Sequence, residues 1–170
     1  MPNTTSTRCL SATDFTAPVE DRYFEDYVPG SVYEYGYVTV SEEDVIDFAL
    51  RYDPQTIHTD PAAAEAGPFG GLIASGWHTA VLCMRLFVDH YLSHVASMAS
   101  PGMDELRWPR PVRPGDTLRF RAAIEAARVS NSNPARGLVH TTAEMWNQDN
   151  ELVLSLKAMN FLRRRSPAAG

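Results

Sequence analysis

The spacing of hydrophobic and polar positions changes twice along the chain, and the first change lies near residue 41. Residues 31–40, SVYEYGYVTV, alternate β-favouring and polar side chains after a Pro-Gly turn signal, which predicts a strand. Ser41 and Asp44 then form a capping box, and apolar residues at helical spacing predict a helix over residues 42–52. We expect this helix to end there, because Pro54 disfavours helical geometry in the residue before it.

Two further helices are predicted before the pattern changes again. Asp60 is suited to capping and Pro61 to a first helical position, which predicts a short helix that closes at Gly67. Residues 72–95 are apolar on most faces and contain Ser75 at a position from which it could cap. They predict a long and largely buried central helix.

From residue 104 onward the spacing is that of strands separated by turn residues. The four predicted strands cover residues 104–112, 117–129, 135–146 and 151–162. This order predicts an α+β fold in which an antiparallel sheet packs on the central helix. The last strand is apolar on both faces, so a second subunit could cover one of them.

The length supports one domain. A chain of 170 residues with 44% hydrophobic content can bury one self-sufficient core. We assign the domain to residues 15–165, with flexible tails at 1–14 and 166–170. The sequence contains neither an apolar run of roughly 20 residues for a membrane span nor a secretory signal, so we expect a cytoplasmic protein. Cys9 and Cys83 are too few for a disulfide framework or a zinc site.

Charge is unevenly distributed. The net charge of -6 argues against nucleic-acid binding. Residues 1–60 hold 12 acidic and 3 basic residues, whereas residues 104–136 hold 7 arginines against 4 acidic residues, and residues 157–165 hold four basic residues and no acid. A local basic surface on an acidic protein suits a small phosphorylated ligand. An ordinary solvated face remains the alternative.

Residues 52–58, Tyr-Asp-Pro-Gln-Thr-Ile-His, carry the first candidate chemistry. Asp53 at a helix end and His58 five residues later lie on one turn stiffened by Pro54, which would join two proton-transfer groups. An aspartate faces the unfavourable end of the helix dipole there, so another interaction is expected to stabilise it. The alternative is a solvated acid and a turn histidine without a catalytic role.

Residues 68–79, PFGGLIASGWHT, form the second segment with candidate chemistry. Gly70, Gly71 and Gly76 permit close backbone approach, and the first turn of the central helix offers free N–H groups to an anion or a polarised carbonyl. The alternative is that these glycines serve only turns and packing. We expect His78 to pack in the core.

Other motifs give less support to a function. His90 and His94 have metal-ligand spacing, but no third ligand is evident and the acid of the H-E-x-x-H pattern is missing, so we expect no metal site. Neither a G-x-G-x-x-G nor a G-x-x-x-x-G-K loop occurs, which gives dinucleotide and ATP chemistry no support.

Three segments together resemble the MaoC-like family of (R)-specific enoyl-CoA hydratases and dehydratases, whose hallmark is D-x-N-P-(L/I/V)-H followed by a Pro-Phe-Gly element. They are YDPQTIH at 52–58, DPAAAEAGPFGGLIASGWHTA at 60–80 and GMDELRWPRPVRPGDTL at 102–118. The resemblance covers about residues 20–162. It implies the hotdog fold, a sheet wrapped around one long helix, in a homodimer or a larger assembly.

The resemblance also implies roles for individual residues. Asp53 and His58 match the catalytic pair that holds one water, and Gly76 matches the residue whose backbone N–H polarises the thioester carbonyl. A CoA or acyl-carrier-protein thioester would be the substrate, and no cofactor would be needed. Expected substrate contacts are Phe69, Gly71, Ser75, Trp77, Arg107 and Arg110, and further candidates for CoA phosphates are Arg113, Arg119, Arg163, Arg164 and Arg165.

Three positions depart from the family pattern. Gln55 and Thr56 stand where the motif has Asn and Pro, and Ser75 stands where many hydratases have His. Two other functions therefore stay open beside hydration or dehydration. One is a hotdog thioesterase that hydrolyses the same class of ligand, and the other is a non-catalytic acyl-CoA binding subunit.

Overall fold

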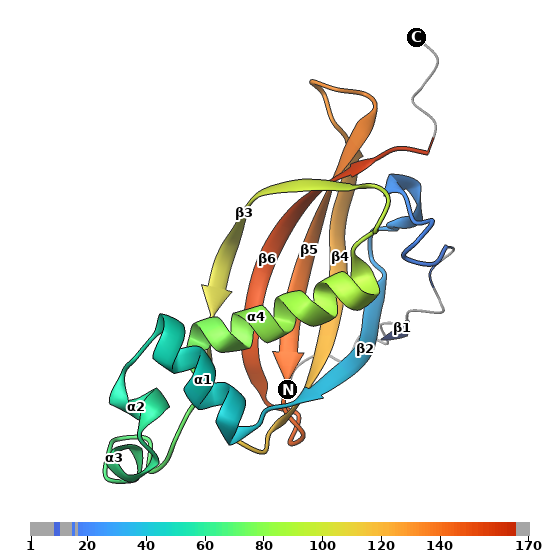
Figure 1. Cartoon of the computed structure of the whole chain (residues 1–170). Helices are drawn as coiled ribbons and strands as arrows, with labels where there is room; N and C mark the ends of the chain where they lie inside the picture. The colour runs from blue at the N-terminus through green and yellow to red at the C-terminus, as the bar shows by residue number, and fades with distance from the viewer. Residues whose placement is uncertain (1–8, 11–14, 16, 166–170) are drawn as a thin grey trace.

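The structure, a computed structural model, describes residues 9–10, 15 and 17–165. Among these residues, six strands form one curved sheet around the central helix α4, in the order β1-β2-β4-β5-β6-β3 (Figure 1). β1 runs parallel to β2, and all other neighbours are antiparallel. The strands are β1 Cys9–Leu10, β2 Val32–Thr39, β3 Ser97–Arg107, β4 Thr117–Val129, β5 Arg136–Trp146 and β6 Leu152–Arg163.

The helices cover the concave face and one end of the sheet (Figure 1). They are α1 Glu42–Tyr52, α2 Thr56–Thr59, α3 Pro61–Glu65 and α4 Gly76–Leu86, and α4 continues as a π-helical turn, Phe87–Tyr91. This arrangement confirms the predicted α+β class, the antiparallel sheet and the central helix. Cys9–Leu10 lie within the predicted N-terminal tail and pair with β2. The rest of that tail, and the C-terminal tail, lie outside the described residues.

The start of α1 follows the predicted cap. The Ser41 hydroxyl accepts the N–H of Asp44 at 3.0 Å, which satisfies one of the donors that a helix start leaves free. Val45 and Ala49 are fully buried against the core. Leu50 and Tyr52 are two of the apolar residues at helical spacing that predicted this helix, yet their side chains are mostly exposed.

The central helix is shorter than the predicted span of residues 72–95. It begins at Gly76 and ends at Tyr91. The preceding apolar residues are extended, because the N–H of Ile73 donates to the carbonyl of Ile57 and the N–H of Ala74 donates to the carbonyl of Val112. Apolar residues suit either conformation, and these backbone bonds select the extended one.

Arg22 closes the other end of the central helix. Its buried guanidinium donates to the carbonyls of His90 and Tyr91 and lies over the ring of Phe15. A cation is favourable at a helix C-terminus, where carbonyl groups lack intrahelical partners. The helix therefore ends at Tyr91, where Arg22 satisfies its last carbonyl groups, and does not continue to residue 95 as the sequence pattern predicts.

Two other elements differ from the prediction. β3 begins at Ser97 instead of residue 104 and ends at Arg107, because Pro109 and Pro111 supply no N–H to a ladder. The four-residue helix α2 lies in a stretch that we expected to be a turn. Of the remaining predicted strands, those over 31–40, 117–129, 135–146 and 151–162 each match an observed strand within about one residue.

The core lies between the sheet and α4. Its fully buried side chains come mostly from the strands, and include Leu118, Phe120, Met145, Val153, Leu154 and Leu162. Val153 and Leu154 are neighbours in β6 where its register with β5 shifts by one residue, and both side chains belong to the same core. From Leu154 onward, buried positions alternate with more exposed ones, so one face of β6 packs against the core. None of the helices in the described part of the chain is long and apolar enough to cross a membrane.

Candidate active site

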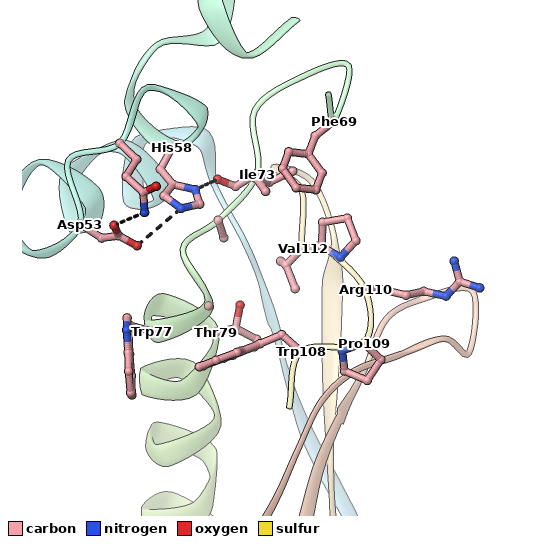
Figure 2. Close-up of a pocket in the computed structure, with 14 residues that line it drawn as sticks. Asp53, His58, Phe69, Ile73, Trp77, Thr79, Trp108, Pro109, Arg110 and Val112 are labelled. Carbon is pink, nitrogen blue, oxygen red and sulfur yellow. Dashed lines mark hydrogen bonds and ion pairs between the residues drawn. The ribbon is translucent and has the colours of Figure 1, made fainter. Parts of the chain in front are cut away.

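The C-terminal end of α1 and the short helix α2 bring Asp53 and His58 together (Figure 2). Nε2 of His58 lies 3.5 Å from Oδ2 of Asp53. His58 is 5% exposed and the Asp53 side chain is 20% exposed, so the pair is largely shielded from bulk water. The sequence interpretation that placed the two groups on one turn is correct about their proximity.

A backbone carbonyl fixes the orientation of the His58 ring. Nδ1 of His58 lies 2.8 Å from the carbonyl oxygen of Ile73. A carbonyl oxygen only accepts hydrogen bonds, so Nδ1 must carry the proton of the neutral ring. Nε2 of that ring is then a free acceptor, and it faces Asp53.

Two side chains hold the carboxylate of Asp53. The Ser75 hydroxyl donates to Oδ2 at 2.6 Å, and the Gln55 amide donates to Oδ1 at 2.6 Å. These bonds favour the ionised form, and they lower the pKa of Asp53 from its ordinary value, the Ser75 bond more than the Gln55 bond. They also supply the stabilisation that its position at the end of α1 requires.

Ser75 links this carboxylate to the start of α4. Its hydroxyl oxygen accepts the N–H of Trp77 at 3.2 Å, so it is the N-cap of α4 while it donates to Asp53. The carboxylate consequently faces the positive end of the α4 dipole. The sequence predicts the cap, but a contact between residues 53 and 75 is set by the tertiary fold.

The pair lies in the wall of an open pocket of about 440 Å³. This volume is within the usual range for small-molecule sites. The pocket is bounded by the start of α4, by the loop that carries Phe69, and by the segment after β3 (Figure 2). Its lining residues are Asp53, Gln55, His58, Phe69, Ile73, Ala74, Gly76, Trp77, Thr79, Trp108, Pro109, Arg110, Pro111 and Val112.

Gly76 is both a lining residue and a close packing contact. A Cβ at this position would lie 2.7 Å from Cε2 of Trp108, closer than real Cβ contacts come. Trp108 also meets Trp77 edge to face, with 5.5 Å between ring centroids. Sequence reasoning missed Trp108, although it lies between the expected contacts Arg107 and Arg110, in a stretch that was predicted as strand.

The other predicted contact residues are not all at the pocket. Phe69, Trp77 and Arg110 line it, whereas Gly71 and Arg107 do not. Arg110 points away from Asp53 and His58 in Figure 2 and pairs with Glu151 at 3.2 Å. The Arg107 guanidinium donates to the neighbouring carbonyl of Leu106.

The remaining arginines that were expected to contact phosphates lie in different parts of the structure. Arg113 donates to the carbonyl of Phe69 and so holds the loop at the pocket rim.

The two ends of β3 show how far the C-terminal arginines lie from the pocket. Ser97 pairs with Leu162 at one end of β3, whereas Arg107 pairs with Ser155 at the other, about 30 Å away. The C-terminal arginines, which follow Leu162, lie at the end far from Trp108. They are engaged there by local partners: Arg163 by the Val95 carbonyl, Arg164 by Glu25, and Arg165 by Asp21 and Asp26. Arg119 contacts Glu34 and Asn150.

The histidines of α4 and its π-helical turn lie outside the pocket. His78 is buried and stacks on Phe48 with an interplanar angle of 9°, which agrees with the expected packing role. Burial lowers the pKa of His78. Nε2 of His94 lies 3.1 Å from the Val88 carbonyl. In the described part of the chain, no three His, Cys, Asp or Glu residues form a group that could hold a metal ion.

Comparison with known proteins identifies a family. The MaoC like domain matches residues 26–146. A 3-hydroxyacyl-thioester dehydratase Z of Mycobacterium tuberculosis is 34% identical over 111 residues, which cover 64% of this chain and 74% of that protein. The family match over residues 26–146 includes Asp53, His58 and Gly76.

Solved structures of related proteins share the fold of this chain. A MaoC-like dehydratase from Rhodospirillum rubrum superposes with a TM-score of 0.77 at 35% identity, covering 85% of this chain and 99% of that one. An R-hydratase from Pseudomonas aeruginosa superposes with a TM-score of 0.69 at 23% identity, covering 84% of this chain and 86% of that one, which shows a shared fold. The expected hotdog fold is therefore confirmed.

Proposed function

Because the chain belongs to the MaoC-like domain family, we propose that it adds water to trans-2-enoyl thioesters to form (3R)-3-hydroxyacyl thioesters, or catalyses the reverse dehydration. Hydration or dehydration of acyl thioesters is the chemistry that the named relatives support. The R configuration rests on the name of the hydratase that shares the fold.

One observation carries the proposal. Nε2 of His58 and Oδ2 of Asp53 are two acceptors 3.5 Å apart at the wall of a pocket. Without a proton between them they repel each other, and a water that donates one hydrogen to each would relieve this. The lone pairs of that water would face the pocket, where C3 of an enoyl thioester would lie.

The protonation states favour His58 as the group that moves the proton. Asp53 is a weak base, because two hydrogen bonds stabilise its anion and lower its pKa. In hydration, the water oxygen forms a bond to C3 while His58 Nε2 takes its proton, and the electron pair of the C2=C3 bond moves toward the thioester carbonyl. The imidazolium then gives its proton to C2 and Asp53 stabilises the cation meanwhile.

The start of α4 offers a hydrogen-bond donor for the thioester carbonyl. Gly76 is the first residue of α4, and the N–H groups of a first turn have no intrahelical partner. A thioester oxygen bound to the Gly76 N–H would gain negative charge as C3 is attacked, and an aligned donor stabilises that charge. The contact with Trp108 keeps this position a glycine.

For the carrier, we propose CoA, with Arg110 and Arg113 near the mouth of the pocket as phosphate contacts and acyl carrier protein as the competing carrier. Glu151 would have to release Arg110 for this contact. The C-terminal arginines are left out of this proposal, because Asp21, Glu25, Asp26 and the Val95 carbonyl already engage them at the far end of the sheet.

A second copy of the chain is the proposed partner. Val81 and Met84 on α4 and Met98 and Met103 on β3 are apolar, and each is about half exposed. β3 is also a sheet edge in the described structure, with backbone groups free on one side. A homodimer would cover both features.

The test is a panel of trans-2-enoyl-CoA substrates from crotonyl to long-chain, with loss of enoyl absorbance, release of free CoA and product chirality measured together. We expect enoyl loss without free CoA, and a (3R) product. Release of free CoA would instead indicate a thioesterase. Tight binding without turnover at any chain length would indicate a non-catalytic subunit.

A further inference from the structure

A second, smaller cavity lies beneath α4, on the side of the helix that faces the sheet. Its volume is about 80 Å³. Ala80, Cys83 and Phe87 of the helical segment form one wall, and Ala143, Leu156 and Ala158 of β5 and β6 form the opposite one. We call this cavity the slot.

Asn160 is the unusual member of the slot. It is 7% exposed, and its Oδ1 has no hydrogen-bond partner among the described residues. Burying an amide oxygen without a partner is costly, and buried polar atoms in folded proteins are nearly always paired. A ligand could therefore supply the hydrogen-bond donor that Oδ1 of Asn160 lacks among the described residues.

The slot and the candidate active site share the same helix. The active-site pocket ends on α4 at Thr79, and the slot begins at Ala80. From Gly76 to Cys83 the helix rises about 10 Å. An acyl chain that starts with its carbonyl at Gly76 and follows α4 toward its C-terminus would reach the slot with its distal carbons.

We propose that the slot binds the distal part of the acyl chain and that Asn160 accepts a hydrogen bond from a hydroxyl group carried there. This rests on the proposed function, because it assumes an acyl thioester in the first pocket. The substrate class would be enoyl thioesters that carry a hydroxyl far from the thioester.

The chemistry of the slot favours a hydroxyl over a charged group. An acceptor oxygen requires a donor, and no charged side chain lines the slot. A carboxylate or an ammonium group would lose its hydration there without meeting an opposite charge. The other polar lining side chain is already satisfied, since the Ser100 hydroxyl donates to the Gly102 carbonyl at 2.8 Å.

The experiment measures binding of saturated acyl-CoA ligands in pairs of equal chain length, one with a terminal hydroxyl and one without, by titration calorimetry. At the chain length that reaches Asn160, we expect the hydroxylated ligand to bind wild-type protein about 3 to 10 times more tightly. Asn160→Leu should abolish or reverse this preference. Ser100→Ala, in the same slot, should keep it.

Ala80→Phe provides a second variant that leaves Asn160 in place. It should fill the slot and weaken binding of both long ligands, while binding of butyryl-CoA stays unchanged. Equal affinity of the two ligands at every chain length in the wild-type protein would overturn the proposal, as would a preference that survives Asn160→Leu. Because binding is measured without turnover, a hydroxyl preference in a protein that hydrates no enoyl-CoA would refute the proposed function and leave the slot assignment standing.

Discussion

Ser75→Ala tests the residue that joins the candidate active site to the central helix. The hydroxyl of Ser75 donates to Asp53 at 2.6 Å and accepts the N–H of Trp77 at 3.2 Å. Alanine removes both bonds and leaves the backbone unchanged. The substitution should therefore reduce both stability and activity.

The two losses have separate magnitudes. Loss of an N-cap costs about 1 kcal/mol. A hydrogen bond to a charged group contributes about 1.5 kcal/mol or more, and the partial exposure of Asp53 places this site at the lower end of that range. Together we expect about 2.5 kcal/mol, which lowers Tm by about 5 to 10 °C in a domain of this size. If Asp53 is misplaced by the loss of one such bond, the turnover number should fall about tenfold.

The pH dependence gives the same variant a second readout. The Ser75 bond lowers the pKa of Asp53, so the stability from this carboxylate is present above its unfolded pKa of about 3.9 and disappears as the pH falls through its folded value. The stability difference between wild type and Ser75→Ala should therefore shrink below about pH 4.

Ser41→Ala is the matched control for this substitution. Ser41 caps α1 by accepting the N–H of Asp44 at 3.0 Å, and it donates to the Asp44 carboxylate at 2.6 Å. Alanine at position 41 therefore removes the same kinds of hydrogen bond at a place away from the pocket. Thermal unfolding and hydration kinetics of both variants decide the question. Unchanged turnover in Ser75→Ala, or an equal loss of turnover in Ser41→Ala, would refute the positioning role.

Three further predictions concern packing, assembly and ligand charge. Gly76→Ala should reduce hydration and stability, because its Cβ would lie 2.7 Å from Trp108, and Trp108→Ala in the same chain should restore stability. Light scattering at micromolar concentration should give at least twice the 18.9 kDa of one chain, and a monomer mass would contradict the proposed dimer. Affinity for acyl-CoA should fall as salt increases and should fall less steeply in Arg110→Gln, whereas affinity independent of salt would exclude a phosphate contact.

Local sequence signals predict most of the fold. Ser41 and Asp44 identify the start of α1, and Asp60 caps α3 by accepting the N–H groups of Ala62 and Ala63, as its position before a proline indicates. The strands after residue 116 are separated by clusters of turn residues, which give their bounds within about one residue. These features depend on neighbours in the sequence, which is why the pattern contains them.

The errors occur where distant contacts decide the conformation. Ala74 is apolar enough for the predicted central helix, but its N–H donates to Val112, and this bond keeps the segment extended. β3 begins earlier than predicted because residues 97–103 do not alternate and pair only with β6. The same reason explains which site residues the sequence predicts. Asp53 and His58 are close in the sequence and were predicted together, whereas the contacts of Ser75 with Asp53 and of Trp108 with Gly76 form only in the folded chain.

The central claim is that Asp53 and His58 act as one unit on a single water. It is tested by hydration rates, measured as loss of enoyl absorbance, in Asp53→Asn, His58→Ala and the double variant. Each single change should reduce the rate by about 10² to 10⁴, and the double variant should be scarcely slower than the slower single one, because groups that act together are not additive. The affinity for a saturated acyl-CoA should change little. Near wild-type turnover in both single variants, or two losses that multiply in the double variant, would contradict the account.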